Sequence, residues 1–194
     1  MAQALASRAA AHDLDLVALA MTGDRAAFGE LVRRHSASVR ALLRRMGADP
    51  ATADDIAQDA FLAAYEQIAD FRGEGAFAAW VRRIAARLYV RRWRKATREA
   101  LALEGSGETD AAEPPAVGAD ARLDLDEALK ALTPSERLCV SLCYGAGLSH
   151  AEAAAALNAP LGTVKSHVKR GLDKLKARLG ASSAEGGQEQ ESHG

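Results

Sequence analysis

The sequence predicts an all-α protein: two small helical domains joined by a flexible acidic linker, the second containing a helix-turn-helix. Ala is abundant in the 194 residues, aromatic residues are only 5%, and strand-like runs of Val, Ile and Thr are missing. Apolar residues recur at three- and four-residue spacing through most of the chain, as amphipathic helices require. One stretch, residues 96–121, interrupts this pattern with Gly, Glu and Pro. We therefore expect domains at 13–95 and 122–180, with a disordered tail at 181–194.

Charge is segregated along the chain, although the formal net charge is only −1. Residues 82–98 contain eight basic residues and no acid, whereas residues 99–120 contain six acids and no base. Residues 161–180 contain six basic residues and one acid. Basic segments separated by an acidic tether are typical of a protein that touches a polyanion at two places.

The first domain begins with a short helix over residues 13–21 and a long helix over residues 24–46. Thr22 and Gly23 end the first helix, and Gly47 ends the second. The long helix carries its apolar residues at helical spacing.

A third helix is predicted over residues 49–70, with Asp49 as its cap and Pro50 in its first turn. One of its faces is apolar and consists of Ala57, Ala60, Phe61, Ala64 and Ile68. The opposite face consists of Asp55, Gln58, Asp59, Leu62 and Glu66. An acidic patch with an apolar anchor suits docking on a basic helical partner, but an ordinary solvated face explains this helix equally well.

The fourth helix, from about residue 76 to 95 or beyond, combines an apolar side with a basic stripe. Phe77, Trp80, Val81, Ile84, Ala85 and Leu88 are expected to pack inward. Arg83, Arg87 and Arg94 follow one stripe beside Trp80, and Tyr89 and Trp93 are interleaved with the arginines. Basic and aromatic residues together favour a nucleic-acid surface that can stack on unpaired bases. Packing explains Phe77 and Trp80 at least as well.

The second domain contains two capping boxes and a tight turn. Thr133 and Glu136 predict the start of a helix that runs to about Tyr144. Ser149 and Glu152 then begin a short helix, which a turn at Asn158, Pro160 and Gly162 separates from a second helix.

The second helix of this pair has one apolar side and one polar side. Val164, Val168, Leu172, Leu175 and Leu179 share the apolar side. Thr163, Ser166, His167 and Arg170 share the opposite side, and Lys165, Lys169 and Lys176 lie along one flank. A capped helix, a turn and a basic second helix favour a DNA recognition helix over a merely solvated charged face.

No arrangement of residues suggests catalysis, a cofactor or a metal. There is no Gly-rich phosphate loop, no cluster of His and Cys ligands and no pair of nucleophile and base. Cys139 and Cys143 are best interpreted as small buried core residues. Without a long apolar run or a signal peptide, the protein is expected to be cytoplasmic and to make no membrane contact of its own.

The order of these segments resembles bacterial sigma factors of the extracytoplasmic-function (ECF) class, which keep only regions 2 and 4. The sequence DDIAQDAFLAAYE at 54–66 resembles the helix with which that family binds core RNA polymerase. FAAWVRRIAARLYVRRWRK at 77–95 resembles its promoter-melting and −10-reading segment, and residues 132–176 resemble its −35-reading domain. The closest motif is GTVKSHVKR at 162–170.

The resemblance implies a role for each matching residue. The polymerase-binding residues would be Asp55, Gln58, Asp59 and Leu62. Those near the opened −10 element would be Trp80, Arg83, Arg87 and Arg94. Those that meet the −35 duplex would be Thr163, Lys165, Ser166, His167, Lys169 and Arg170. The family commonly has Asn at Arg87, Asp at Arg91 and Arg at His167, so the sequence departs from it there.

The resemblance also implies partners: core RNA polymerase, promoter DNA and an anti-sigma factor that holds the protein inactive. Two alternatives remain at this stage. A two-domain helix-turn-helix regulator would leave the acidic patch at residues 55–59 unexplained. A sigma-like mimic that titrates an anti-sigma factor would carry a receiver domain, and no α/β segment of that kind is present.

Overall fold

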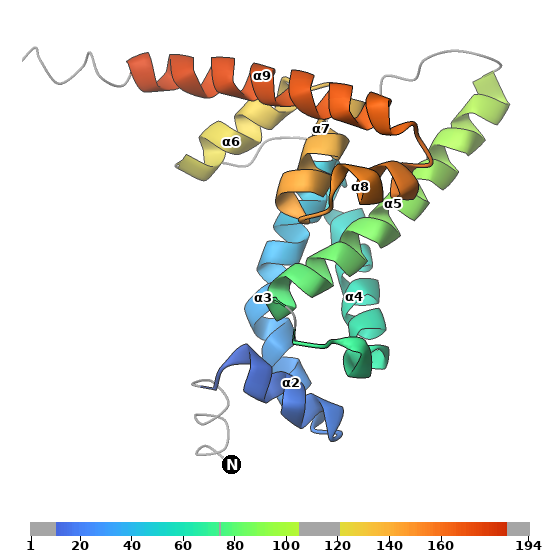
Figure 1. Ribbon diagram of the computed structural model, residues 1–194, viewed down its shortest axis with the longest axis vertical. Helices are drawn as coiled ribbons and strands as arrows, with labels where there is room; N and C mark the ends of the chain where they lie inside the picture. Colours follow the sequence, from blue (N-terminus) through green and yellow to red (C-terminus); the bar gives the residue numbers. More distant parts are fainter. Residues whose placement is uncertain (1–10, 74, 105–120, 186–194) are drawn as a thin grey trace, which may run out of the picture. The chain divides into compact units, whose positions relative to one another are not determined.

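The computed structural model describes residues 11–73, 75–104 and 121–185, and no strand occurs among them. Figure 1 shows helices throughout the described residues, which confirms the predicted all-α class. The chain divides into two compact units. The first comprises residues 1–44 and 48–93, and the second comprises residues 45–47 and 94–194. The predicted acidic linker falls largely on residues 105–120, outside the described part of the chain.

The first unit is built from four α-helices and one turn of 3₁₀ helix. These are α2 (Asp13–Met21), α3 (Arg25–Met46), α4 (Pro50–Glu66), η1 (Ile68–Asp70) and α5 (Phe77–Glu104). The last two residues of α3 and the part of α5 from Arg94 onward belong to the second unit. Side-chain caps begin two of the α-helices. Asp24 Oδ1 accepts the backbone N–H groups of Ala26 and Ala27 before α3, and Asp49 Oδ1 accepts the N–H of Thr52 in α4.

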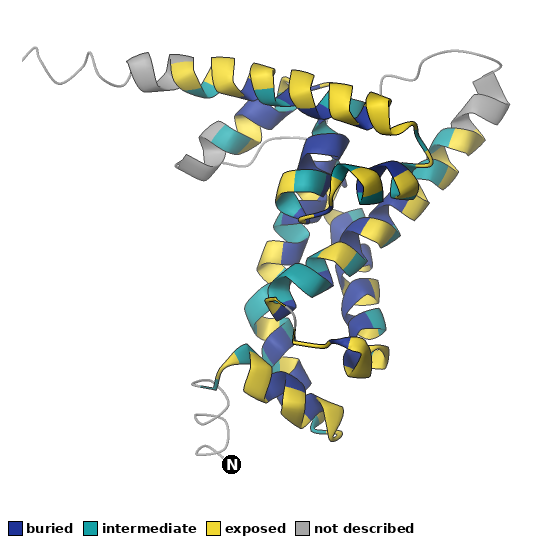
Figure 2. Cartoon of the chain, viewed as in Figure 1, coloured by how far each residue is buried: buried dark blue, intermediate teal, exposed yellow. Residues whose placement is uncertain are grey.

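The core of the first unit collects one apolar stripe from each helix. Leu16, Leu31, Ala60 and Val81 are fully or almost fully buried. Aromatic rings fill the space beside them: Phe77 lies edge-to-face with Phe28 and Phe71, at centroid distances of 6.4 and 5.9 Å. Because the stripes face inward, the opposite side of each helix faces solvent, as Figure 2 shows by colour.

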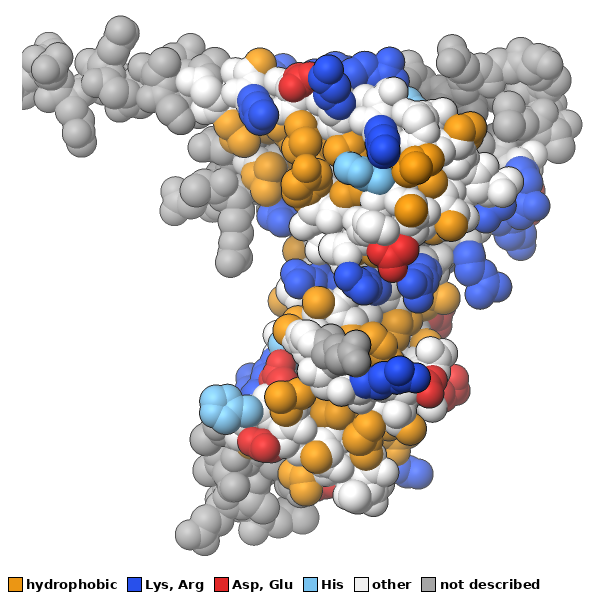
Figure 3. All heavy atoms as spheres, in the orientation of Figure 1, with side chains coloured by type: hydrophobic (Ala, Val, Ile, Leu, Met, Phe, Trp, Pro, Cys, Tyr) orange, Lys and Arg blue, Asp and Glu red, His pale blue; other side chains and the backbone are white. Residues whose placement is uncertain are grey.

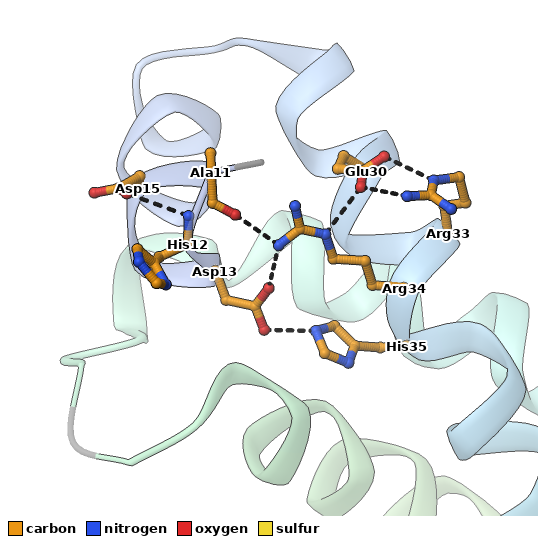
Figure 4. A network of polar contacts seen from close by, with 8 residues as sticks. All are labelled: Ala11, His12, Asp13, Asp15, Glu30, Arg33, Arg34 and His35. Carbon is orange, nitrogen blue, oxygen red and sulfur yellow. Dashed lines mark hydrogen bonds and ion pairs between the residues drawn. The ribbon is translucent and has the colours of Figure 1, made fainter. Parts of the chain in front are cut away.

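Polar contacts fasten α2 to α3 (Figure 4). Arg34 Nη1 donates to Asp13 Oδ1 at 2.9 Å and to the Ala11 carbonyl at 2.8 Å, while the second oxygen of Asp13 lies 2.7 Å from His35 Nε2. Hydrogen bonds from Arg33 and Arg34 lower the pKa of Glu30 to about 2. His35, which is isolated among arginines in the sequence, is therefore a packing residue: its contact with Asp13 links α3 to α2.

The second unit consists of α6 (Ala121–Lys130), α7 (Pro134–Val140), η2 (Ser141–Gly145), α8 (His150–Leu157) and α9 (Leu161–Glu185). Both predicted capping boxes are present, from Thr133 to Glu136 and from Ser149 to Glu152. Asn158 ends α8 in the left-handed conformation with φ 53°, and α9 begins three residues later. The predicted helix-turn-helix is thus confirmed as α8, turn and α9.

The apolar side of α9 forms the core of the second unit, as predicted. Val164, Val168 and Leu175 are buried. Leu175 joins a cluster with Ala128, Leu129, Leu132 and Val140, against which Leu125, Leu172 and Leu179 pack. Helices α6 and α7 therefore hold α9 from one side only, and its other side remains exposed.

Four predicted boundaries differ from the structure. The helix predicted over residues 49–70 ends at Glu66, and a separate 3₁₀ turn, Ile68–Asp70, follows it. Helix α5 continues to Glu104, nine residues into the predicted linker, because residues 96–104 are mostly Ala, Leu, Arg and Glu and the first glycine is Gly105. Helix α9 continues to Glu185, five residues into the predicted tail, because Gly180 does not end it. The helix expected to run to Tyr144 changes at Ser141 into a π-helical turn, which has no simple sequence signal.

Helices α7 and α9 lie close together at Gly171. A Cβ at this position would lie 2.7 Å from Val140 Cγ2 and 3.6 Å from the backbone oxygen of Glu136. Val140 is buried and β-branched, so it cannot rotate away freely. Gly171 therefore sets the distance between the two helices.

We expect Gly171→Ala to destabilise the second unit. Overpacking costs about 1–3 kcal/mol and the gain in helix propensity offsets about 1 kcal/mol, which leaves a net loss of about 1 kcal/mol. The matched control is Gly180→Ala in the same helix, where a Cβ meets nothing within 4 Å and a gain of up to about 1 kcal/mol is expected. Hydrogen exchange of the α9 amides in the whole chain measures both. Equal effects of the two variants would contradict the close-packing argument.

Candidate partner-binding and nucleic-acid surfaces

The outer face of α4 is acidic and carries one exposed leucine. Asp55, Gln58 and Asp59 are exposed, and Leu62 exposes 63% of its surface. Ile56 and Phe61 on the opposite side are buried, so packing in the first unit fixes which side of α4 faces outward. The nearest basic group is Arg92, whose Nη1 lies 4.0 Å from Asp55 Oδ2. Such an exposed pair is weak and leaves the carboxylate available to a partner.

The basic side of α5 starts from an aromatic residue that is anchored in the core. Trp80 is half-buried, and its ring centroid lies 5.3 Å from that of Phe71 and 5.8 Å from that of Phe77. Arg83 and Arg87 follow Trp80 at three and seven residues and are exposed. Arg94, seven residues beyond Arg87, is half-buried. The tryptophan therefore holds a fixed position from which the arginine stripe begins.

Tyr89 corrects the sequence interpretation of this helix. It was expected among the arginines on a nucleic-acid surface, yet it exposes only 7% of its surface. Tyr89 follows Val81 and Ala85 at four-residue spacing, and both of these are fully buried. It belongs to the inward stripe, so it cannot stack on an unpaired base. Trp93, the other interleaved aromatic, is half-buried.

The exposed side of α9 carries nearly all of its predicted DNA-contacting residues. Thr163, Lys165, Ser166, Lys169 and Arg170 are exposed, and only His167 is half-buried. Figure 3 shows lysine and arginine side chains along this helix. Ser166 Oγ donates to the Gly162 carbonyl at 2.9 Å, which leaves the hydroxyl oxygen as an acceptor toward a ligand.

A polar network behind this surface was not predicted. Glu136 is only 4% exposed; its Oε2 accepts hydrogen bonds from Thr133 N at 3.1 Å and from Lys174 Nζ at 2.7 Å. Its Oε1 lies 3.8 Å from Arg170 Nε. Arg170 Nη2 in turn lies 3.2 Å from His167 Nδ1. Two of the predicted DNA-contacting residues are thus connected to a buried carboxylate on α7.

Two pKa shifts follow from this network. Burial raises the pKa of Glu136, but hydrogen bonds from Lys174 and Thr133 and the charge of Lys174 outweigh it, so the net pKa is lowered. Burial and the charge of Arg170 lower the pKa of His167 from 6.5, against the opposing charge of Glu136. At neutral pH, Glu136 is therefore an anion and His167 is a neutral ring.

The described residues contain no group of three or more His, Cys, Asp or Glu side chains that could hold a metal ion. Cys139 is buried, which raises its thiol pKa to about 11 and keeps it protonated at neutral pH. No helix in the part of the chain that the structure describes is long and apolar enough to cross a membrane.

Comparison with known proteins identifies a family region in each of the two units. The family model for Sigma-70 region 2 matches residues 31–99, and that for Sigma-70 region 4 matches residues 128–177. The ECF RNA polymerase sigma factor SigE of Mycolicibacterium smegmatis is 36% identical over 174 residues, which cover 84% of this chain and 67% of SigE. The RNA polymerase sigma factor NccH of Alcaligenes xylosoxydans xylosoxydans is 33% identical, covering 88% of this chain and 96% of NccH. The chain belongs to the ECF sigma factors.

Solved structures of ECF sigma factors have the same fold. The sigma factor RpoE of Bartonella quintana, in complex with the anti-sigma factor NepR, is 26% identical with a TM-score of 0.52 and covers 78% of this chain and 96% of its own. CnrH in complex with the cytosolic domain of CnrY is 31% identical with a TM-score of 0.51, covering 87% and 97%. In this sigma factor, region 2 contains the α4 face and most of α5, and region 4 contains α7, α8 and most of α9.

The lowered pKa of Glu136 predicts how the stability of the second unit depends on pH. The unfolded carboxyl titrates near 4.5, so the stabilisation is complete above that pH and is lost as pH falls through the lower folded value. Glu136→Gln should flatten this dependence below about pH 4.5, because an amide does not titrate. The matched control is Glu127→Gln on α6, which changes an exposed carboxylate. Hydrogen exchange of α7 and α9 between pH 6 and pH 3 would reveal the difference, and identical slopes for Glu136→Gln and wild type would contradict it.

Proposed function

We propose that this ECF sigma factor binds core RNA polymerase through the outer face of α4, the opened −10 element through α5 and the −35 duplex through α9. It would thereby direct promoter-specific initiation without being an enzyme, in the cytoplasm where RNA polymerase acts. The observation that carries the proposal is α9 itself. Its apolar side is buried against α6 and α7, while six predicted DNA-contacting residues occupy its other side.

The two units support two different steps of recognition. Helix α9 presents hydroxyl, imidazole, lysine and arginine groups to a major groove, where base edges carry a distinguishable pattern of donors and acceptors. Helix α5 presents arginines beside the half-buried Trp80, whose remaining exposed surface suits stacking on a base that has left the duplex. Recognition of the −35 duplex and capture of an unpaired −10 base are thus assigned to different helices.

The acidic face of α4 supports docking on the polymerase. Its carboxylates and the exposed Leu62 combine charge complementarity with an apolar anchor, and they suit a basic helical partner. We also propose that an anti-sigma factor masks these surfaces in the absence of a signal. The support is that the solved relatives named above were captured with NepR and with the cytosolic domain of CnrY.

Charge reversal on α4 tests the docking surface. Asp55→Arg with Asp59→Arg should abolish co-purification with core polymerase and leave the helical content unchanged, because both side chains are exposed. The control is Asp15→Arg with Glu127→Arg, which makes the same charge change on exposed residues outside α4. Undiminished binding of the α4 variant would remove the docking assignment.

Truncation of one α9 side chain tests the −35 assignment. Arg170→Ala should weaken transcription from a −35-dependent promoter by about 1–3 kcal/mol if the arginine reads a base. Arg178→Ala on the same helix, also exposed but displaced toward the C-terminus, should have little effect. In vitro transcription with purified core polymerase measures both variants. Full activity of Arg170→Ala would count against α9 as the reading helix.

A further inference from the structure

The carboxylate of Glu136 lies between two side chains of α9 that are one helical turn apart. Its Oε2 is 2.7 Å from Lys174 Nζ, and its Oε1 is 3.8 Å from Arg170 Nε. Gly171, between these two residues, lets the α9 backbone approach α7 so closely that a Cβ there would be 3.6 Å from Glu136 Cβ. The Glu136 carboxylate on α7 therefore contacts α9 within the second unit.

Glu136 is also fixed on its own helix. It is the N3 residue of the α7 capping box, where Oε2 accepts the Thr133 backbone N–H and the Thr133 hydroxyl accepts the Glu136 N–H at 3.3 Å. With its side chain 5% exposed, it cannot move toward solvent without losing these contacts. Arg170, by contrast, is 60% exposed, so this buried anion restrains a side chain that would otherwise be free to change rotamer.

The contact between Arg170 and His167 determines the state of the imidazole ring. A guanidinium has only donors, so the 3.2 Å contact from Arg170 Nη2 requires His167 Nδ1 to be an acceptor. The ring proton then resides on Nε2, which makes that nitrogen a donor. A major groove offers acceptors to such a donor at guanine N7 and O6, adenine N7 and thymine O4.

We propose that Glu136 is a positioning residue for promoter recognition: by restraining Arg170, it holds His167 as an Nε2–H donor toward an acceptor on the −35 duplex. The proposal rests on the proposed role of α9 as the reading helix. Glu136 itself touches no DNA. It selects between sequences because it determines which hydrogen-bonding group the helix presents.

This role has a signature that a purely structural role lacks. A buried anion beneath a DNA-facing helix repels phosphates, so its removal should leave non-specific affinity equal or higher. Its removal should also free Arg170 and allow His167 to change tautomer, so discrimination between −35 sequences should fall. A residue that only stabilised the fold would lower affinity for all sequences together.

The experiment uses wild-type and Glu136→Gln sigma factor, each assembled with core polymerase, on promoters whose −35 element has been randomised. The amide oxygen of Gln can still accept from Thr133 and Lys174, so the variant should fold. We expect the preference for the best −35 sequences over scrambled ones to fall about 5- to 10-fold, the loss of roughly one base-specific contact. Lys174→Met should lose stability yet keep its preference, because it leaves Glu136 beside Arg170.

A double-mutant cycle tests whether Glu136 affects promoter discrimination through His167. If Glu136 acts through this ring, Glu136→Gln added to His167→Ala should reduce discrimination no further than His167→Ala alone. Glu136→Asp provides the test if Glu136→Gln does not fold: it keeps a carboxylate on α7 but draws it back from Arg170 by one methylene, and it should reproduce the loss of preference. Arg170→Lys would not separate the two routes, because Arg170 is itself a proposed base contact.

Unchanged discrimination in folded Glu136→Gln, or additive effects with His167→Ala, would overturn the inference while leaving the function of α9 intact. Absence of any −35 preference in the wild-type holoenzyme would instead overturn the proposed function. The two failures are therefore distinguishable within one set of measurements.

Discussion

The close approach of α7 to α9 at Gly171 is the constraint on which region 4 depends. It allows Val140 and the Glu136 backbone to contact the helix directly, and it brings the Glu136 carboxylate within reach of Arg170 and Lys174. The apolar cluster around Leu175 then prevents rotation of α9 about its own axis. Together these contacts determine which side of the helix faces solvent and which polar groups it presents there.

A buried carboxylate in such a place is not explained by stability alone. Desolvation opposes its charge, and an apolar residue of similar volume could fill the space at equal or lower cost. The negative charge of Glu136 instead orients the polar side chains of α9. It binds Lys174 and restrains Arg170, and through Arg170 it determines which nitrogen of His167 carries the proton. Under the proposed role of Glu136, the network serves recognition at some expense to the packing energy of the unit.

Periodicity and capping predicted most of the fold because they depend on residues three or four positions apart. Asp49, Thr133 and Ser149 cap helices as expected, and the apolar side of α9 is buried. Tyr89 was misplaced because composition suggested an aromatic-basic surface, whereas helical spacing from Val81 and Ala85 turns it inward. The π-helical turn at Ser141 has no comparable sequence signal.

Some features of the candidate sites could likewise be predicted from the sequence, and others could not. Exposure of the α4 acids and of the α9 polar side followed from the sequence, because each lies opposite an apolar stripe on its own helix. The contacts of Glu136 did not follow, because Lys174 is 38 residues away and only the packing of α7 on α9 joins them. The sequence assigns Glu136 to the α7 capping box, which it does occupy. In addition, its Oε2 accepts a hydrogen bond from Lys174 and its Oε1 lies near Arg170, and no sequence pattern indicates these two contacts.

The charge distribution favours recognition by a neutral donor. With a net charge of −1, the chain gains little general attraction to DNA, and under the proposed function the basic groups of α9 would serve mainly to position it on phosphates. Additional positive charge on the reading side would strengthen binding to every sequence alike. A neutral imidazole, kept neutral by burial and by Arg170, adds no such non-specific attraction and distinguishes bases by hydrogen bonding alone. If α9 reads the −35 duplex as proposed, having His167 where the family commonly has arginine would exchange affinity for selectivity at one position of the helix.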